Sequence, residues 1–247
     1  MPSSSNTETP KRAQETKESI WDIWDYSLGL AGYLTTSDSP VQVEGSIAGR
    51  PFYFRARGQH WSLAVAGDPY SVDAVDIEQN MDGGDRYWEE DWGVRQFDAS
   101  YMPHSEALRL VRRCAEAYVA EFDLNPPWML GLWGTVFSPF APGTVHAMDR
   151  KRFRRLSPKH LMFECIAEDE SYLTLGHPAG TFRVDWKSFW LAKQPRFKYS
   201  QPVEHGSSLG VVEAIRWRSP DILYEVQFAD RRLKIPESEL RASDREG

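Results

Sequence analysis

Apolar and polar residues alternate along two short runs, residues 52–57 and 60–65, which a two-residue break separates. Period-two alternation is typical of a half-buried β-strand, and the intervening Gly58-Gln59 fits a type II′ turn, which favours glycine in its first position. We therefore predict a hairpin in which three apolar pairs share one face. The pairs are Phe52 with Val65, Phe54 with Leu63, and Ala56 with Trp61. Residues 43–47 alternate in the same way and predict a third antiparallel strand before Ala48-Gly49-Arg50.

Two segments carry apolar residues at helical spacing. The first covers residues 19–33, where Gly29 and Gly32 weaken the pattern. The second begins at Ser105-Glu106, and we expect it to end before Asn125-Pro126-Pro127, because a residue that precedes proline is driven out of the α region. Its apolar stripe comprises Leu108, Val111, Ala115, Tyr118, Val119 and Phe122. We expect this helix to pack on the three-stranded meander.

The second half of the chain reads as β-structure throughout. Its strand-like runs cover residues 161–165, 172–175, 182–186, 211–217, 224–228 and 233–235. Short strands at about ten-residue spacing favour a small barrel. The sequence therefore predicts an α+β fold with a disordered tail (1–17), an amino-terminal antiparallel β-meander with a helix (18–125), and a mostly β domain (126–247).

Negative charge is concentrated between Asp68 and Asp98. Ten acids in this segment face only Arg86 and Arg95, which gives a net charge of −8 where the whole chain carries −7. Clustered carboxylates with embedded aromatic residues suit a surface for a basic protein, because charge speeds encounter and desolvated aromatics supply affinity. The predicted contact residues are Asp82, Asp85, Trp88, Glu89, Glu90, Asp91 and Trp92. A surface loop that its charges keep soluble is the alternative interpretation.

A basic stretch lies in the second half. Six cations fall between residues 150 and 159, with Phe153 interleaved, a pattern that could grip nucleic acid or an acidic partner. They are Arg150, Lys151, Arg152, Arg154, Arg155 and Lys159. A solvated turn or helix that balances the acidic segment is the alternative. Because the sequence pI is near 5.4, nucleic-acid binding by the molecule as a whole is disfavoured.

The sequence shows no recognisable catalytic, cofactor or metal site. Residues 206–210 match G-x-S-x-G, but the α/β-hydrolase elbow needs a strand before the serine and a histidine after it, and the last histidine is His205. The histidines are scattered, and Asp82-Gly83-Gly84-Asp85 lacks the ligand spacing of an EF-hand. We therefore predict no catalytic residue, cofactor or metal. An enzyme with a diffuse site built on Glu89 or Asp91 is the enzymatic alternative.

Composition indicates a globular chain, since 247 residues with 41% hydrophobic content suffice to build real cores. No apolar run approaches the roughly 18 residues of a membrane helix. The first ten residues also lack the apolar centre of a secretory signal. We expect a cytoplasmic protein in which Cys114 and Cys165 are buried thiols.

Two resemblances add to this interpretation. Residues 210–217, Tyr224-Glu225-Val226 and Ile235 with Glu239-Leu240 resemble the late strands of SH3-like barrel modules, which implies such a barrel within residues 210–240. In general character, the acidic, Trp-rich chain without an active site is similar to bacterial immunity or antitoxin proteins.

The second resemblance implies that the acids oppose the basic groove of a nuclease-like toxin, with Trp88 and Trp92 as anchors, and neutralise it by occlusion. A nucleic-acid-associated SH3-like factor and a structural or assembly subunit of a bacterial or phage machine are the alternatives. No pattern in the sequence indicates an oligomeric state.

Overall fold

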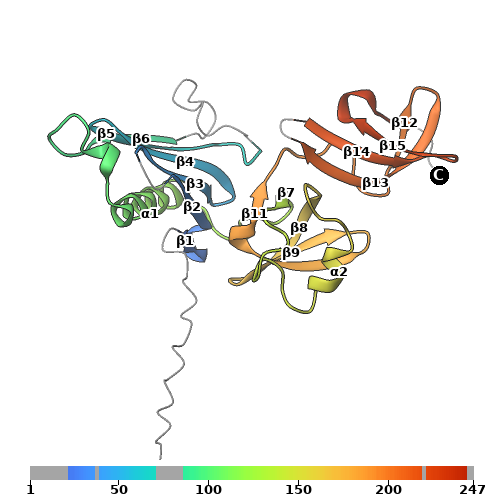
Figure 1. Ribbon diagram of the computed structural model, residues 1–247, viewed down its shortest axis with the longest axis horizontal. Helices are drawn as coiled ribbons and strands as arrows, with labels where there is room; N and C mark the ends of the chain where they lie inside the picture. Colours follow the sequence, from blue (N-terminus) through green and yellow to red (C-terminus); the bar gives the residue numbers. More distant parts are fainter. Residues whose placement is uncertain (1–21, 37–38, 71–85, 219–220, 244–247) are drawn as a thin grey trace, which may run out of the picture.

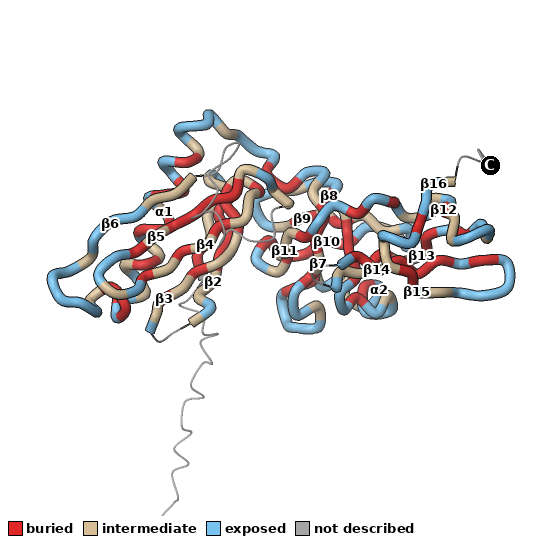
Figure 2. The backbone as a smooth tube through the Cα atoms, turned by 90° about the horizontal axis from the view of Figure 1, so that it is seen from above, coloured by how far each residue is buried: buried red, intermediate tan, exposed pale blue. Residues whose placement is uncertain are grey.

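Three antiparallel sheets follow one another along the long axis of the molecule in a computed structural model that describes residues 22–36, 39–70, 86–218 and 221–243 (Figure 1). Buried positions follow the strands of every sheet, whereas most hairpin tips are exposed (Figure 2). The described residues are mostly in β-strands, with few helices, and this β-rich character agrees with the predicted fold class. The predicted tail, residues 1–17, lies outside the described residues.

The first sheet has six strands in the order β1-β2-β3-β4-β5-β6, so each strand pairs with its neighbour in sequence. The strands are β1 (Asp22–Asp25), β2 (Leu30–Thr36), β3 (Val41–Ile47), β4 (Arg50–Arg57), β5 (His60–Val65) and β6 (Arg86–Asp91). The predicted meander is β3 to β5. The predicted hairpin register is confirmed at all three apolar pairs, and Gly58 has the positive φ of 66° that the first position of the turn requires.

The predicted helix over residues 19–33 is wrong. The described part of this segment forms β1, the 3₁₀ turn η1 (Tyr26–Leu28) and β2. Gly29 ends η1 at a φ of 56°, a left-handed conformation that stops a helix, and the residues after it pair with β3. Gly32 lies where a Cβ would come within 2.9 Å of the Phe52 ring, so close packing explains the second glycine.

Apolar residues of β1 point to two different faces, which is why they resembled a helical pattern. Ile23 is buried in the first core. Its neighbour Trp24 lies on the opposite face against Trp186 of the second hydrophobic core, with ring centroids 5.1 Å apart. The outer face of β1 carries an apolar residue because the second core covers it. The sequence of β1 alone does not show that this second core will lie there.

Helix α1 (His104–Glu121) covers one face of the first sheet, as predicted. It follows the 3₁₀ turn η3 (Ala99–Tyr101). The buried stripe differs slightly from the predicted one, because Leu110 and Cys114 are buried whereas Phe122 is 37% exposed. The helix residues buried in this core are Ala107, Leu110, Val111, Cys114, Ala115 and Tyr118.

The second and third sheets repeat one plan, which we call the five-strand unit. The first unit contains β7 (Trp133–Val136), β8 (Met162–Glu168), β9 (Tyr172–His177), β10 (Gly180–Asp185), the 3₁₀ turn η4 (Trp186–Ser188) and β11 (Phe189–Leu191). The second contains β12 (Pro202–His205), β13 (Ser208–Arg218), β14 (Asp221–Gln227), β15 (Arg232–Pro236), the 3₁₀ turn η5 (Glu237–Glu239) and β16 (Arg241–Ala242). In each unit four strands meander, a 3₁₀ turn follows, and the fifth strand returns to pair with the first.

The correspondence between the two units extends to the register of their strands. The second strand of each unit carries an irregularity at the same place, between Cys165 and Ala167 in one and between Val212 and Ala214 in the other. Equivalent rows of cross-strand partners follow from this register. These rows are Cys165, Leu175 and Phe182 in the first unit and Val212, Val226 and Leu233 in the second.

Six strand-like runs of the second half are confirmed as β8, β9, β10, β13, β14 and β15. Residues 206–207 of the G-x-S-x-G match form the turn between β12 and β13, as expected for a loop between strands. Neither unit closes into the expected small barrel, because the outer strands of each sheet are not paired with each other within the described chain.

The first sheet and the first unit are joined by a packed segment after the double proline. Trp128 is buried, its indole N–H donates to the Tyr26 carbonyl at 2.7 Å, and its backbone N–H donates to the Glu168 carboxylate at 2.7 Å. A second contact is an aromatic stack in which Trp190 lies between Tyr33 and Phe137, with centroids 5.2 and 4.5 Å apart. The domain boundaries at residues 17 and 125 stay a prediction.

Candidate binding surface

Strand β6 carries the described part of the predicted acidic surface and forms one edge of the first sheet. Its register with β5 divides the acids between two faces, because directly paired residues share a face. Glu90 pairs with Trp61 and Trp88 pairs with Leu63, so both lie on the side that α1 covers. Glu89 and Asp91 lie on the opposite side.

Glu90, on the helix-covered side, already has a partner within the chain. Its carboxylate lies 2.8 Å from the Arg113 guanidinium, and Arg113 also lies over the Trp61 ring at 5.3 Å. Arg86 pairs with Glu121 on the same side. These two ion pairs tie the edge strand to α1, so the charge of Glu90 is offset internally although its side chain is 51% exposed.

Glu89 and Asp91 present their carboxylates to solvent. The Asp91 side chain is 92% exposed, with Nδ1 of His60 3.9 Å away, and Glu89 accepts a 3.3 Å hydrogen bond from the Tyr87 hydroxyl. Trp88 and Trp92 are half-buried and pack against the first core, so each offers only part of its ring. Asp82 and Asp85 lie outside the described residues.

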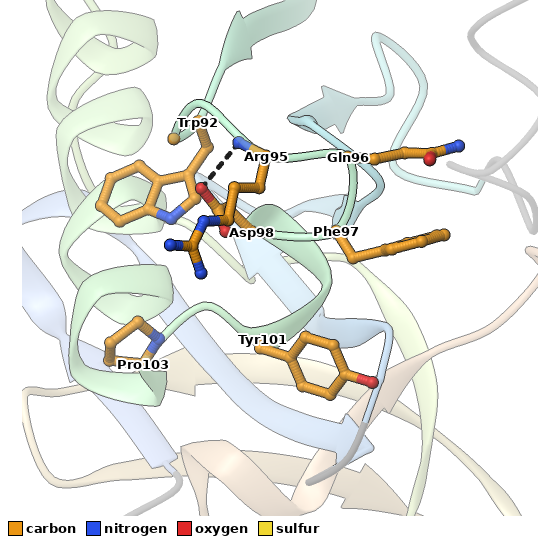
Figure 3. Close-up of a pocket in the computed structure, with 8 residues that line it drawn as sticks. Trp92, Arg95, Gln96, Phe97, Asp98, Tyr101 and Pro103 are labelled. Atoms are coloured by element: carbon orange, nitrogen blue, oxygen red, sulfur yellow. Dashed lines mark hydrogen bonds between the residues drawn. The ribbon is translucent and has the colours of Figure 1, made fainter.

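Directly after β6, residues 92–103 form a loop around an open pocket of about 790 Å³ (Figure 3). The loop is bound to the predicted hairpin turn. The backbone N–H of Trp92 donates to the Gln59 carbonyl at 2.5 Å, and the backbone N–H of Ala99 donates to the Gly58 carbonyl. The Gly58 N–H in turn donates to the Ser100 hydroxyl. The pocket lining comprises Trp92, Gly93, Arg95, Gln96, Phe97, Asp98, Tyr101 and Pro103.

Asp98 organises the first part of this loop. Its carboxylate accepts 2.9 Å hydrogen bonds from the backbone N–H groups of Val94 and Arg95, and Figure 3 shows the second of these bonds. Both bonds lower the pKa of Asp98. Gly93 lies against Asp98 at a φ of 78°, where a Cβ would meet the aspartate Cβ at 2.4 Å. Both contacts hold the loop in one conformation.

Apolar side chains on this loop are unusually exposed. Val94 is 90% exposed, Phe97 59% and Tyr101 75%, and Figure 3 shows Phe97 and Tyr101 projecting away from α1. These three residues were not predicted as a group, because their spacing matches neither a helix nor a strand and they follow the densest run of acids. The sequence did contain one signal of their exposure. Three large apolar residues stand among Gly, Gln, Arg and Asp, in a segment with no strand or helix pattern that would bury them.

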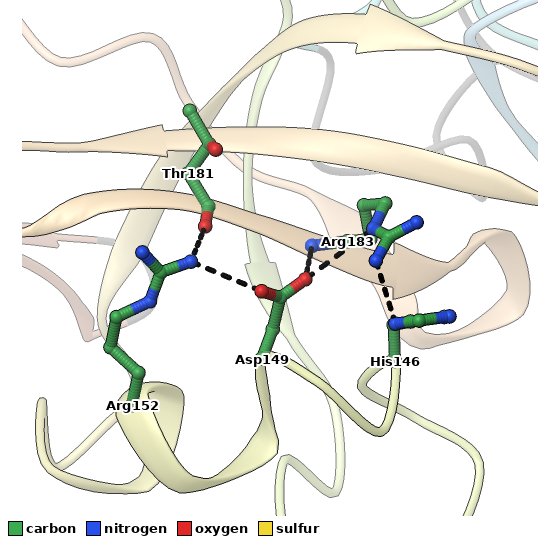
Figure 4. Close-up of polar contacts among 5 residues, drawn as sticks. All are labelled: His146, Asp149, Arg152, Thr181 and Arg183. Carbon is green, nitrogen blue, oxygen red and sulfur yellow. Dashed lines mark hydrogen bonds and ion pairs between the residues drawn. The ribbon is translucent and has the colours of Figure 1, made fainter.

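The basic stretch lies on the long connection between β7 and β8, where residues Arg150–Arg154 form the short helix α2. Phe153 is fully buried in the core of the first unit and does not interleave with the charges at the surface. Arg152 donates to the Asp149 carboxylate at 3.0 Å and to the Thr181 carbonyl at 2.6 Å, and Arg183 binds the other oxygen of Asp149 (Figure 4). Arg152 is therefore neutralised within the chain.

Four other cations of this stretch are exposed and form no ion pair in the part of the chain that the structure describes. They are Lys151, Arg154, Arg155 and Lys159. Arg150 is half-buried. Among the described residues, His, Cys, Asp and Glu side chains form no group of three that could hold a metal ion. No helix in the described ranges is long and apolar enough to cross a membrane.

Fold and surface together define a β-rich, three-sheet protein whose distinctive features are surfaces suited to binding. A model of a family of unknown function, DUF6960, matches residues 137–236, which is less than half of the chain. The match runs from the residue after β7 to the last residue of β15, so it covers most of both five-strand units and none of the first sheet. No curated protein and no solved structure matches the chain.

Proposed function

We propose that this protein binds a basic protein partner in the cytoplasm and neutralises it by occlusion, in the manner of toxin-neutralising immunity proteins. The observation that carries the proposal is the hydrogen-bonded loop at residues 92–103, which exposes Phe97 and Tyr101 and follows the exposed Asp91 directly in the chain. Residues 89–101 therefore expose carboxylates and large apolar side chains within one short segment.

The two kinds of side chain have different roles in the proposed contact. Glu89 and Asp91 attract a positively charged groove over several ångströms and so speed association. Phe97 and Tyr101 supply apolar area that water leaves on binding. Because Asp98 and the hairpin turn already fix the loop, binding loses little conformational entropy. Glu90 keeps its ion pair with Arg113 and supports the strand.

We further propose that the two five-strand units are SH3-like modules. The support is the order of elements, with four meandering strands, a 3₁₀ turn and a fifth strand that returns to the first. Both sheets are open, so the modules are incomplete barrels. In this proposal the two units do not contact the partner, and the first sheet carries the surface that binds it.

The experiment uses the full chain as bait to isolate the partner from its host, followed by binding kinetics with the purified pair. Glu89→Lys combined with Asp91→Lys should slow association about tenfold or more at low ionic strength, and added salt should remove the difference. Phe97→Ala combined with Tyr101→Ala should instead speed dissociation, by roughly 30-fold for a loss of about 2 kcal/mol.

Matched controls carry the same changes elsewhere. Glu170→Lys with Asp230→Lys reverses two exposed acids on the five-strand units, and Phe140→Ala truncates an aromatic side chain that is 52% exposed. Both controls should bind like the native chain. Unchanged kinetics for the Glu89 and Asp91 variant at low salt, or equal effects in the controls, would refute the proposed surface.

A further inference from the structure

The two five-strand units differ most in the connection between their first and second strands. In the second unit, Gly206-Ser207 alone joins β12 to β13. In the first unit, residues 137–161 join β7 to β8 and include α2. Since one copy folds with a two-residue turn, the plan itself does not require the long connection. Long connections within compact units usually carry function.

The inner side of this connection is structural. Val145 and Phe153 fill the core of the first unit, and Leu156 packs against it. The Asp149 carboxylate, held by Arg152 and Arg183, fastens the connection to β10 (Figure 4). These contacts fix the outer side of α2 in place, so Lys151, Arg154 and Arg155 lie on a rigid support.

The end of the connection lies against the second five-strand unit. Leu161 forms an antiparallel bridge with Arg216, and the backbone N–H of Trp217 donates to the His160 carbonyl at 2.8 Å. Arg216 is itself paired with Glu225 at 2.6 Å. The chain turns at His160, whose φ is 62°, and the Ser157 and Lys159 carbonyls accept hydrogen bonds from the Arg216 guanidinium.

These contacts place the backbone of Lys159 beside Arg216 of β13. The Lys159 side chain is exposed and forms no ion pair within the described chain. Lys159 therefore extends the exposed cations of α2 toward the second five-strand unit.

We infer that a row of exposed cations, Lys151, Arg154, Arg155 and Lys159, binds the phosphate backbone of a nucleic acid. The inference is independent of the proposed protein partner, which binds through the first sheet. An acidic protein would need apolar anchors as well as charge. Phe153 and Leu156 point inward and leave the row almost purely cationic, which suffices for phosphates.

The acidic character of the whole chain does not oppose this inference. The described acids Glu89 and Asp91 belong to the first sheet, whereas α2 belongs to the second, in a different lobe of the molecule (Figure 1). Exposed charges interact over about 8 Å at physiological ionic strength. A phosphate at the row therefore experiences the local cations far more than the net charge of −7.

The test is fluorescence anisotropy with labelled duplex and single-stranded oligonucleotides and the intact protein, over a series of salt concentrations. With four phosphate contacts, the logarithm of the duplex association constant should fall with the logarithm of salt at a slope of about −4. Arg154→Ala with Arg155→Ala should make that slope less steep by about 2 and weaken binding at low salt. Lys151→Ala with Lys159→Ala should act similarly.

The matched control is Arg231→Ala with Arg241→Ala, which removes two exposed arginines of the second unit away from the row. It should leave the slope unchanged. The thermal midpoint of each variant, compared with that of the native protein, separates lost binding from lost folding. Absence of binding by the native chain at low salt would overturn the inference. So would equal weakening by the control, or equal affinity for polyglutamate.

Discussion

Trp61 is the side chain whose removal tests the first core most directly. It is 1% exposed, stacks on Phe54 with ring centroids 5.8 Å apart, and lies under the Arg113 guanidinium at 5.3 Å. Its partner across the strands, Ala56, is too small to fill the space that an indole leaves. Trp61→Ala therefore creates a large cavity between the sheet and α1.

The expected loss is about 4–5 kcal/mol of unfolding free energy. Emptying a large aromatic core site costs roughly 3–5 kcal/mol. The stacked ring pair, worth about 0.5–1.5 kcal/mol, and the cation–π contact, worth about 0.5–1 kcal/mol, are lost with the indole, so we expect a value in the upper part of that range. For a chain of this length, the thermal midpoint should fall by about 8–20 °C.

Urea denaturation followed by far-UV circular dichroism measures the effect, because α1 packs on this core and supplies most of the described helix. Phe97→Ala is the control, since its ring is 59% exposed and its loss should change the free energy by less than about 0.5 kcal/mol. A loss below about 1.5 kcal/mol for Trp61→Ala would mean that the face assigned to the core is not what stabilises the first sheet.

Two further predictions concern titratable groups that are half-buried or buried. Burial lowers the pKa of His177, and its Nδ1 accepts a hydrogen bond from the Ala179 N–H at 3.0 Å, so protonation is less favourable in the folded state. Its contribution to stability is thus complete above the unfolded pKa of about 6.5 and is lost as the pH falls from there to the folded pKa. Urea midpoints at about pH 7.5 and pH 5.5 should differ less in His177→Phe than in the native protein, and an identical pH dependence would contradict the assignment. Burial also raises the pKa of the Cys114 and Cys165 thiols to about 12. A thiol reagent at neutral pH should therefore label the unfolded chain much faster than the folded one. Rapid labelling of the native protein would show that the thiols are accessible.

Several elements were decided by local sequence. The hairpin of β4 and β5 was predictable to the residue, because alternation and a glycine-first turn fix the register without any distant partner. The strands β8, β9 and β10, which short turns separate, were predictable to within about three residues at each end. Helix α1 was predictable because its period of 3.6 persists over 18 residues and prolines lie beyond its end.

Tertiary structure decided what these segments share with distant ones. Strands β1 and β2 formed in place of a helix because β3 pairs with β2, and because the first and second cores cover opposite faces of β1. Glu90 is neutralised only because pairing with β5 turns it toward Arg113, 23 residues further along the chain. The repeat of the five-strand unit is equally hidden from sequence, since it lies in pairing order and register and the two copies fill equivalent positions with different residues. Local propensity sets which residues can form a strand or a helix, but the face that each residue presents depends on which partner supplies the other half of the core.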